Sequence, residues 1–287
     1  MDETYVFEDL ENLVLKDKEY RLKMRKIITI VLLIIITAII ITIALVFILR
    51  EVLRKKGGKI ICYYKTTKDN ENIRLINLKD NIDFSLIIDD DSYDKNNYHS
   101  FENAGLHTVI YEFKNEMDTL DNLFYEINNL IEVDFSEFVT NNIKSMSNLF
   151  RQCNNLTKVA FGSNFDTSKV TKMDYMFFDC EELIELDLSS FNLERVTNTY
   201  LMFGLCFKLK RIKMNNNTRT NNLEIMTNMF RWCRSLEYIN AEILNANKAK
   251  NLNYIFAYCY TLREIKISYF LSTNLKELRG AFIGCKI

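Results

Sequence analysis

Proline is absent from the 287-residue chain, and glycine and histidine are scarce, with seven and two copies. The loops are rich in asparagine instead, a residue that tolerates left-handed turn positions. His99 and His107 have no partner motif at a catalytic spacing, and the sequence contains no GxSxG, P-loop, GxGxxG or HExxH motif. We therefore expect no enzymatic activity and no cofactor.

Neither sign of charge is in excess, because 37 Lys and Arg residues face 38 Asp and Glu residues. A nucleic-acid-binding domain presents a basic patch or stripe, so we expect no nucleic-acid partner. CxxC spacing is absent, which argues against zinc. The acidic cluster at residues 89–94 lacks the alternating oxygen ligands and glycine typical of a calcium loop. We interpret it as a solvated turn and expect no metal site.

One long apolar run is present. Residues 27–49 read IITIVLLIIITAIIITIALVFIL, 23 residues without a charge, which is long enough to cross a ~30 Å hydrocarbon layer. A cleaved signal peptide is the alternative, but its apolar region spans only about 7–15 residues and precedes an A-x-A-like site. The following REVLRKKGGK offers no such site, so the sequence favours an uncleaved signal anchor.

Two segments flank the span. Residues 1–26 form a polar tail, and residues 50–114 form a juxtamembrane segment and N-terminal cap with four short predicted strands, KIICYYKTT, NIRLINL, FSLII and TVIYEF. Leu106, Val109 and Tyr111 fit an LxxLxL pattern, and we interpret them as a degenerate first repeat strand. Basic residues lie on both sides of the span, so the positive-inside rule does not decide its orientation.

Residues 115–287 repeat with a period of 26–27 residues. The period is set by anchor residues, a term used here for Ile127 and the six cysteines that follow it, Cys153, Cys180, Cys206, Cys233, Cys259 and Cys285. A phenylalanine stands three residues before every anchor: Phe124, Phe150, Phe177, Phe203, Phe230, Phe256 and Phe282. A fixed period of this length with an LxxLxL pattern is typical of a leucine-rich solenoid.

The apolar spacing predicts a helix, a tight turn and a strand in each unit. Val170, Met173 and Met176 precede Phe177 at intervals that place all four on one helical face. After the anchor, Leu186 and Leu188 alternate with polar residues, as in a half-buried strand. The predicted fold is therefore an α/β leucine-rich repeat solenoid with a parallel β-sheet face, preceded by a single transmembrane helix. The phenylalanines and cysteines expected to hold the repeats together structurally are Phe150, Cys153, Phe177, Cys180, Phe203, Cys206, Phe230, Cys233, Phe256 and Cys259.

The stretches MFFDCEELIELDLSSFN and MFRWCRSLEYINAEIL resemble the BspA-like leucine-rich repeats, whose consensus is similar to V-T-x-M-x-x-M-F-x-x-C-x-x-L-x-x-L-D-L-S-x-F. The resemblance covers roughly residues 115–287. Two departures are KLKRIKMNNN after Cys206 and Ile127 in place of the first cysteine. The resemblance implies a surface-exposed protein that binds host matrix or other cells.

The cysteines occupy one structural column, so their Cβ atoms stay farther apart than the roughly 3.8 Å of a disulfide. We expect free thiols that pack as small hydrophobes.

The exposed strand residues form the predicted ligand-binding face. Rows five and seven residues after the anchors lie side by side in a parallel stack, and the first row alternates in charge, which stabilises neighbouring strands. The face consists of Lys158, Glu185, Arg211, Lys213, Tyr238 and Asn240. Asn155 and Asn216 lie in glycosylation sequons, which matter only if the repeats face a secretory lumen.

Three functions remain open. The first is a single-pass protein of the plasma membrane or cell surface, with a cytoplasmic N-terminus and repeats that bind a protein or matrix ligand in adhesion. The second is a membrane-tethered scaffold whose repeats face the cytoplasm, which suits unpaired thiols. The third is a structural surface-coat protein without a defined ligand.

Overall fold

The computed structural model of the chain describes residues 3–54, 57–79, 81–163, 165–215, 220–239, 244, 246–263, 265 and 274–286. Its internal contacts divide the chain into two compact units, Met1–Arg54 and Lys55–Ile287. We call them the helical unit and the folded unit and treat each separately.

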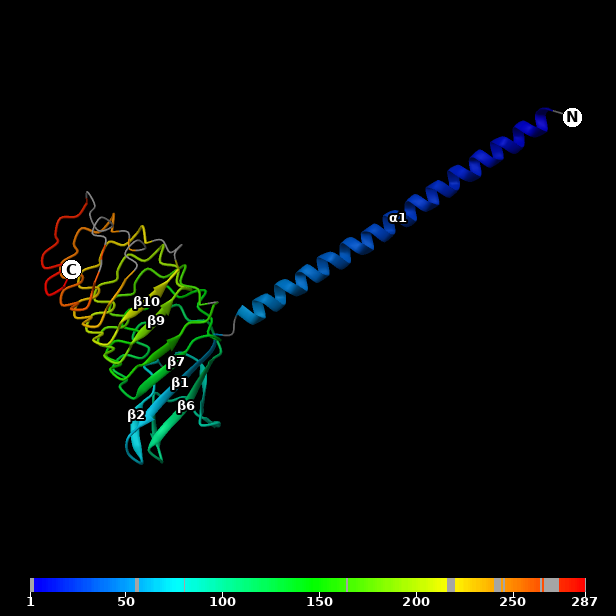
Figure 1. The fold of residues 1–287 in the computed structure, drawn as a ribbon. Helices are drawn as coiled ribbons and strands as arrows, with labels where there is room; N and C mark the ends of the chain where they lie inside the picture. Colours follow the sequence, from blue (N-terminus) through cyan, green and yellow to red (C-terminus); the bar gives the residue numbers. More distant parts are fainter. Residues whose placement is uncertain are drawn as a thin grey trace. The chain divides into compact units, whose positions relative to one another are not determined.

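The helical unit is one helix, α1 (Glu3–Arg54) (Figure 1). From Glu3 onward, the predicted polar tail and the apolar run at 27–49 therefore belong to one continuous helix. Its stretch Arg21–Val46 has a mean hydropathy of 3.2 over its most apolar window, and none of that window is buried. At 1.5 Å per residue, these 26 residues exceed the ~30 Å hydrocarbon thickness. This single N-terminal apolar helix is compatible with a membrane anchor or a signal peptide.

The folded unit begins with a sheet whose order is β4-β3-β6-β1-β7-β8 (Figure 1). Its strands are β1 (Gly58–Thr66), β3 (Phe84–Ile88), β4 (Asp91–Tyr93), β6 (Gly105–Phe113), β7 (Leu130–Asp134) and β8 (Lys158–Ala160). Only the β7–β8 pair is parallel in this sheet; every other pair is antiparallel. β2 (Glu71–Arg74) and β5 (Tyr98–Phe101) pair separately and antiparallel. β9 (Glu185–Leu188) and β10 (Arg211–Met214) form a parallel two-stranded sheet.

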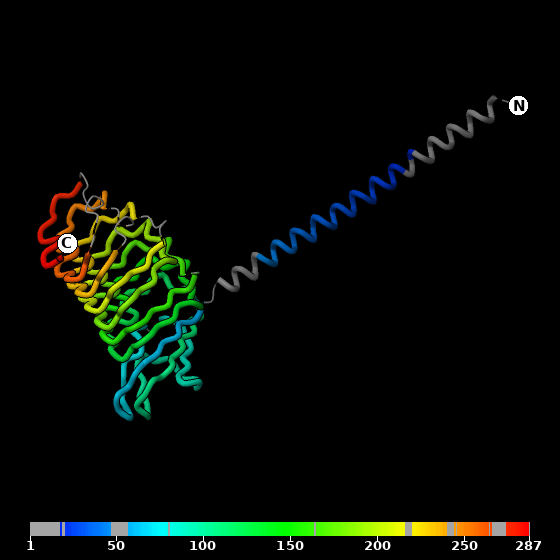
Figure 2. The backbone as a smooth tube through the Cα atoms, in the orientation of Figure 1, coloured from blue at the N-terminus to red at the C-terminus, as the bar shows by residue number. Residues whose placement is uncertain are grey.

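From Asp118 onward the chain forms successive units that stack on one another, visible as parallel loops from green to red in Figure 2. The segment before each anchor donates alternate backbone N–H groups to carbonyls of the next unit. Between two of the units these bonds run from Met146 to Lys172, Asn148 to Asp174, Phe150 to Met176 and Gln152 to Phe178, at 2.8–3.0 Å. A ladder of parallel bridges through Thr119, Ser145, Lys172, Asn198, Ile225, Asn251 and Glu277 follows the same register.

Asn77 covers the first of these units. Its backbone N–H donates to the carbonyl of Leu123 at 2.9 Å, and its side-chain amide donates to the carbonyls of Asn122 and Tyr125 at 3.1 and 2.8 Å. The carbonyls of Leu123 and Tyr125 occupy positions that accept bonds from a preceding unit elsewhere in the stack, as those of Met176 and Phe178 do. The Asn122 carbonyl also accepts the bond from Tyr125 N within its own turn. Asn77 therefore replaces a preceding unit at this end.

The prediction of an α/β leucine-rich repeat solenoid with a parallel β-sheet face is wrong. The residues described between 57 and 286 contain no helix, the main sheet is mixed, and β9 and β10 form a sheet of their own. The preceding apolar helix keeps its predicted type, and the strand predicted around Leu186 and Leu188 is present as β9. The four short strands predicted between residues 50 and 114 correspond to β1, β2, β3 and β6. The degenerate repeat strand is also wrong, because β6 pairs antiparallel with β1 and β3, and Leu106 is 66% exposed.

Two left-handed residues in every unit explain why no helix forms. They lie five residues and one residue before the anchor, as Tyr175 (φ 55°) and Asp179 (φ 63°) do before Cys180. A right-handed helix requires negative φ throughout. Each turn is closed by a hydrogen bond from the N–H of its fourth residue to the carbonyl of its first, such as Cys180 N to Phe177 O at 3.2 Å. The third residue of this turn, Asp179, has a positive φ, as a type II turn requires. Successive turns thus place the apolar residues on one side at helix-like spacing.

Candidate functional site

We call the side of the folded unit that is formed by β7, β8, β9 and β10 the strand side. It carries the predicted ligand-binding face. Because β9 and β10 pair in register, Arg211 lies opposite Glu185 and Lys213 opposite Asp187. Arg211 Nε lies 3.5 Å from Glu185 Oε1, and Lys213 Nζ lies 2.8 Å from Asp187 Oδ2. Each cation therefore has a carboxylate partner on the neighbouring strand.

The rest of the predicted face is more dispersed. Lys158 pairs with Glu132 at 3.0 Å across β7 and β8, a different sheet from that of Arg211. Tyr238 is 59% exposed, and its backbone forms an isolated parallel β-bridge with that of Arg211. Asn240 lies outside the described residues. The structure thus brings Glu185, Arg211 and Tyr238 together as three neighbouring rows, with Lys213 beside them.

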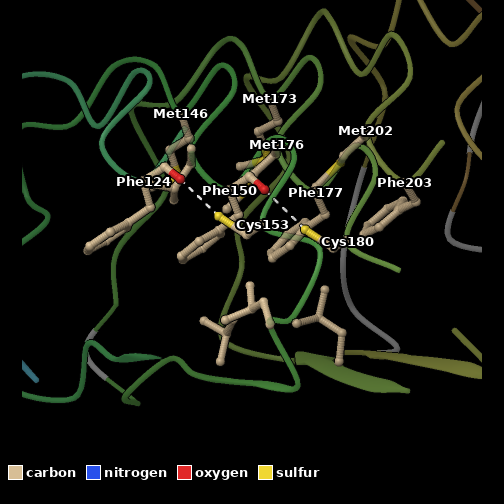
Figure 3. Close-up of a cluster of buried hydrophobic side chains, with 14 of the residues drawn as sticks. Phe124, Met146, Phe150, Cys153, Met173, Met176, Phe177, Cys180, Met202 and Phe203 are labelled. Carbon is tan, nitrogen blue, oxygen red and sulfur yellow. Dashed lines mark hydrogen bonds between the residues drawn. The ribbon is translucent and has the colours of Figure 1, made fainter. Parts of the chain in front are cut away.

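We call the side formed by the left-handed turns before each anchor the turn side. The anchor cysteines lie there, in the column that the sequence predicts. Each thiol donates to the carbonyl of the phenylalanine in the preceding unit, as Cys153 does to Phe124 at 2.8 Å and Cys180 to Phe150 at 3.1 Å (Figure 3). Cys206, Cys233, Cys259 and Cys285 repeat this bond to Phe177, Phe203, Phe230 and Phe256. All seven cysteines are free thiols. Sequence reasoning assigned them packing alone and missed the hydrogen bond.

Burial keeps these thiols protonated. Burial raises the pKa of Cys153 to about 12, although a backbone hydrogen bond from Ile127 opposes the shift. Burial also raises the pKa of Cys180 well above its usual value, with smaller contributions from the neighbouring thiols Cys206 and Cys153. A thiol needs its proton to donate to a carbonyl. The column is therefore a set of structural donors rather than reactive thiolates.

The phenylalanines form a continuous stack beside the thiols. Phe203 lies between Phe177 and Phe230, with ring centroids 5.7 and 5.3 Å away and interplanar angles of 4° and 8°. Its side chain is fully buried. Phe124, Phe150, Phe256 and Phe282 extend the same stack, and Figure 3 shows its first four rings.

A second surface was missed by sequence reasoning. Five residues on three successive units touch one another in the rows next to the anchors, and we call them the Trp232 patch: Phe207, Trp232, Arg234, Tyr258 and Tyr260. Trp232 stacks on Tyr258 with centroids 4.0 Å apart, and Arg234 lies 4.5 Å from the centroid of Phe207. Aromatic residues in the rows directly before and after the cysteines were the available signal.

A hydrogen-bonded histidine lies in the N-terminal sheet. Asp89 Oδ2 lies 2.7 Å from His107 Nδ1, and His107 Nε2 lies 3.1 Å from the Thr66 hydroxyl, an order of groups similar to a charge relay. The Thr66 side chain is only 2% exposed, and its hydroxyl accepts a 3.0 Å bond from Gly105 N. A substrate has no access to this hydroxyl, so the group ties β1 to β6 rather than presenting a nucleophile.

The remaining predicted sites add no chemistry. Asn155 is exposed, and its amide donates to the carbonyl of Asn128 at 2.9 Å. Asn216 lies outside the described residues. Among the residues that the structure describes, no group of three or more His, Cys, Asp or Glu side chains is placed to hold a metal ion.

Taken together, these features define a chain with an apolar N-terminal helix and a folded unit of stacked turns. One family model matches residues 118–237 and 211–286, more than half of the chain, and its description is "Mycoplasma protein of unknown function, DUF285". The chain belongs to this family. Searches of curated proteins and of solved structures found no match. The family description names no activity, and the resemblance to BspA-like repeats stays a prediction.

Proposed function

We propose that the chain is a membrane-anchored, non-catalytic protein of the cell surface that binds another protein or a matrix component through its folded unit. The apolar stretch Arg21–Val46 of α1 carries the first part of this proposal, because its most apolar 18-residue window is wholly exposed in the structure. An exposed surface of this kind is unfavourable in water and favourable in lipid. In this proposal α1 stays attached as a single-pass anchor of the plasma membrane, with its N-terminus in the cytoplasm.

The binding part of the proposal is supported by two exposed surfaces of the folded unit. The strand side offers Lys158, Glu185, Arg211, Lys213 and Tyr238, whose ion pairs are exposed and therefore weak. The turn side offers the Trp232 patch. Tryptophan, tyrosine and arginine are the residues that most often dominate protein–protein binding energy.

The free thiols favour one competing function, a scaffold whose folded unit faces the cytoplasm, because cytoplasmic proteins keep their thiols reduced. Protease added to intact cells separates the two. The surface proposal predicts loss of the folded unit and an anchored stub of α1. Full protection of the folded unit, with digestion after lysis as the control, contradicts it and favours the scaffold.

Binding itself is tested on the full chain in liposomes, with matrix proteins and cells as targets. Arg211→Ala and Tyr238→Ala are expected to weaken binding without lowering the melting temperature if the strand side is the contact. Saturable binding to a target supports the proposal. Surface exposure without binding to any target favours the structural surface-coat function instead.

A further inference from the structure

We propose that the Trp232 patch is a docking surface for a protein partner whose contacting segment carries carboxylates among apolar side chains. The proposal rests on the proposed function as a binding protein and assigns it a surface and a partner chemistry. The patch provides apolar ring surface together with an arginine fork, which matches a carboxylate through two parallel hydrogen bonds.

The patch is continuous across three units. Arg234 lies over two rings, with its guanidinium carbon 4.5 Å from the Phe207 centroid and 5.0 Å from the Trp232 centroid. Trp232 then stacks on Tyr258, and Tyr260 meets the edge of both rings at 6.4 and 6.3 Å. The rings fix one another, so little side-chain entropy remains to be lost when a partner binds.

Charge on the patch is unbalanced, unlike charge on the strand side. Arg234 is exposed and forms no ion pair with a carboxylate among the described residues. On the strand side, Lys158, Arg211 and Lys213 each have a carboxylate. An exposed arginine without an acceptor favours a partner that brings carboxylates.

The ring geometry favours a protein partner over a lipid surface. The rings of Trp232 and Tyr258 are stacked 16° from parallel, and both residues are half-buried, whereas Tyr260 is 38% exposed. Side chains that insert into a bilayer interface present their rings to it. A pair of stacked, half-buried rings with an exposed tyrosine and an exposed arginine packed on it has the composition of a binding hot spot.

Trp232 is the only tryptophan in the chain, so its fluorescence reports on the patch directly. The full chain is reconstituted in phosphatidylcholine liposomes and titrated with a tryptophan-free peptide that interleaves Glu, Leu and Ser. A matched peptide with Gln in place of Glu is the control probe. We expect a saturable change in Trp232 emission with the acidic peptide and a much weaker one with the neutral peptide.

Arg234→Gln is expected to weaken binding of the acidic peptide about tenfold or more, the size of one charge-assisted hydrogen bond. Arg195→Gln is the matched control, because Arg195 is exposed and belongs neither to the predicted ligand-binding face nor to the Trp232 patch. Tyr260→Ala provides a second variant at an exposed position. The melting temperatures of all three are expected to equal that of the parent.

Three results overturn the proposal: equal binding of both peptides, an equal loss in Arg195→Gln or Arg211→Gln, or an emission change on adding phosphatidylserine to the liposomes without peptide. The last result assigns the patch to the membrane surface. If target binding persists in Arg234→Gln and Tyr260→Ala, the proposed function stands and only this surface is rejected.

Discussion

The turn side and the strand side of the folded unit hold neighbouring units together in different ways. On the turn side, rings, thiol bonds and alternate backbone N–H groups link the units from Phe124 to Phe282. On the strand side, β7 and β8 pair in one sheet and β9 and β10 in another. Among the described residues, the bridge between Arg211 and Tyr238 continues the strand side beyond β10.

This difference indicates that the turns carry most of the cohesion of the stack. Fully burying an aromatic side chain stabilises a fold by about 1.5–3 kcal/mol, and the turn side repeats this burial in unit after unit. An exposed ion pair contributes about 0–1 kcal/mol. The exposed residues of the strand side are therefore the ones that tolerate substitution most readily, whereas Leu186 and Leu188 between them are buried.

The largest expected effect is that of Phe203→Ala. Removing a fully buried ring that stacks on both neighbours is expected to lower the free energy of unfolding by about 3–5 kcal/mol. Lys213→Ala on the strand side is the control, with an expected loss below about 1 kcal/mol. Denaturant unfolding of both variants measures the difference. Similar losses contradict the division between the two sides.

Cys180→Ala tests the thiol column. We expect a loss of about 1–3 kcal/mol, because the change removes buried volume and the bond to the Phe150 carbonyl. Cys285→Ala is the matched variant, since Cys285 makes the same bond to Phe256 but is only partly buried; its loss is expected to be smaller. Mass spectrometry without reduction adds a check, and a disulfide between neighbouring anchors contradicts the assigned column geometry.

Alkaline pH weakens the same column. Because the pKa of Cys153 is about 12 in the folded state and about 8.5 when unfolded, its stabilisation is complete below pH 8.5 and is lost as the pH rises towards 12. Between pH 8.5 and pH 10, the free energy of unfolding is expected to fall by about 2 kcal/mol for this one thiol. Denaturant unfolding at both pH values is expected to show a smaller decline for Cys153→Ala than for the parent. An identical decline rules out this thiol as a contributor.

Leu205→Gly sharpens the comparison in the opposite direction. Leu205 has a φ of 62°, where an L-residue costs roughly 1–2 kcal/mol and glycine does not. Glycine loses more conformational entropy on folding, which offsets part of this relief. We therefore expect the free energy of unfolding to rise by about 0.5–1 kcal/mol. Ile184→Gly is the control on the strand side, because Ile184 is exposed and has no positive φ. Its stability is expected to fall, and a rise in both variants contradicts the turn assignment.

Much of the stack follows from the sequence. The 26–27-residue period, the buried columns at Phe177 and Cys180, and the charge pairing of Arg211 with Glu185 are all readable from single-residue spacing. These features depend only on which residues recur at one offset. The same offset analysis indicated which side chains face the core.

The helix prediction failed because successive turns repeat apolar residues at the same intervals as a helix. Gly280 and Gly284 occupy the two left-handed positions of the last unit, and Asn122, Asn148 and Asn228 occupy one of them in other units. These residues are the sequence signal for the turns. The Trp232 patch was missed for another reason: its members lie in rows outside the apolar pattern and meet only when three units are stacked.

Hydrogen exchange of the full chain in detergent micelles tests most directly whether the turns hold the stack together. The amides of Phe177, Phe203 and Phe230 donate across units on the turn side, and those of Thr157, Lys210 and Glu237 do so on the strand side. We predict that the three phenylalanine amides exchange only on global unfolding, while the strand-side amides exchange earlier through local opening. Strand-side amides that outlast the phenylalanine amides would contradict this account.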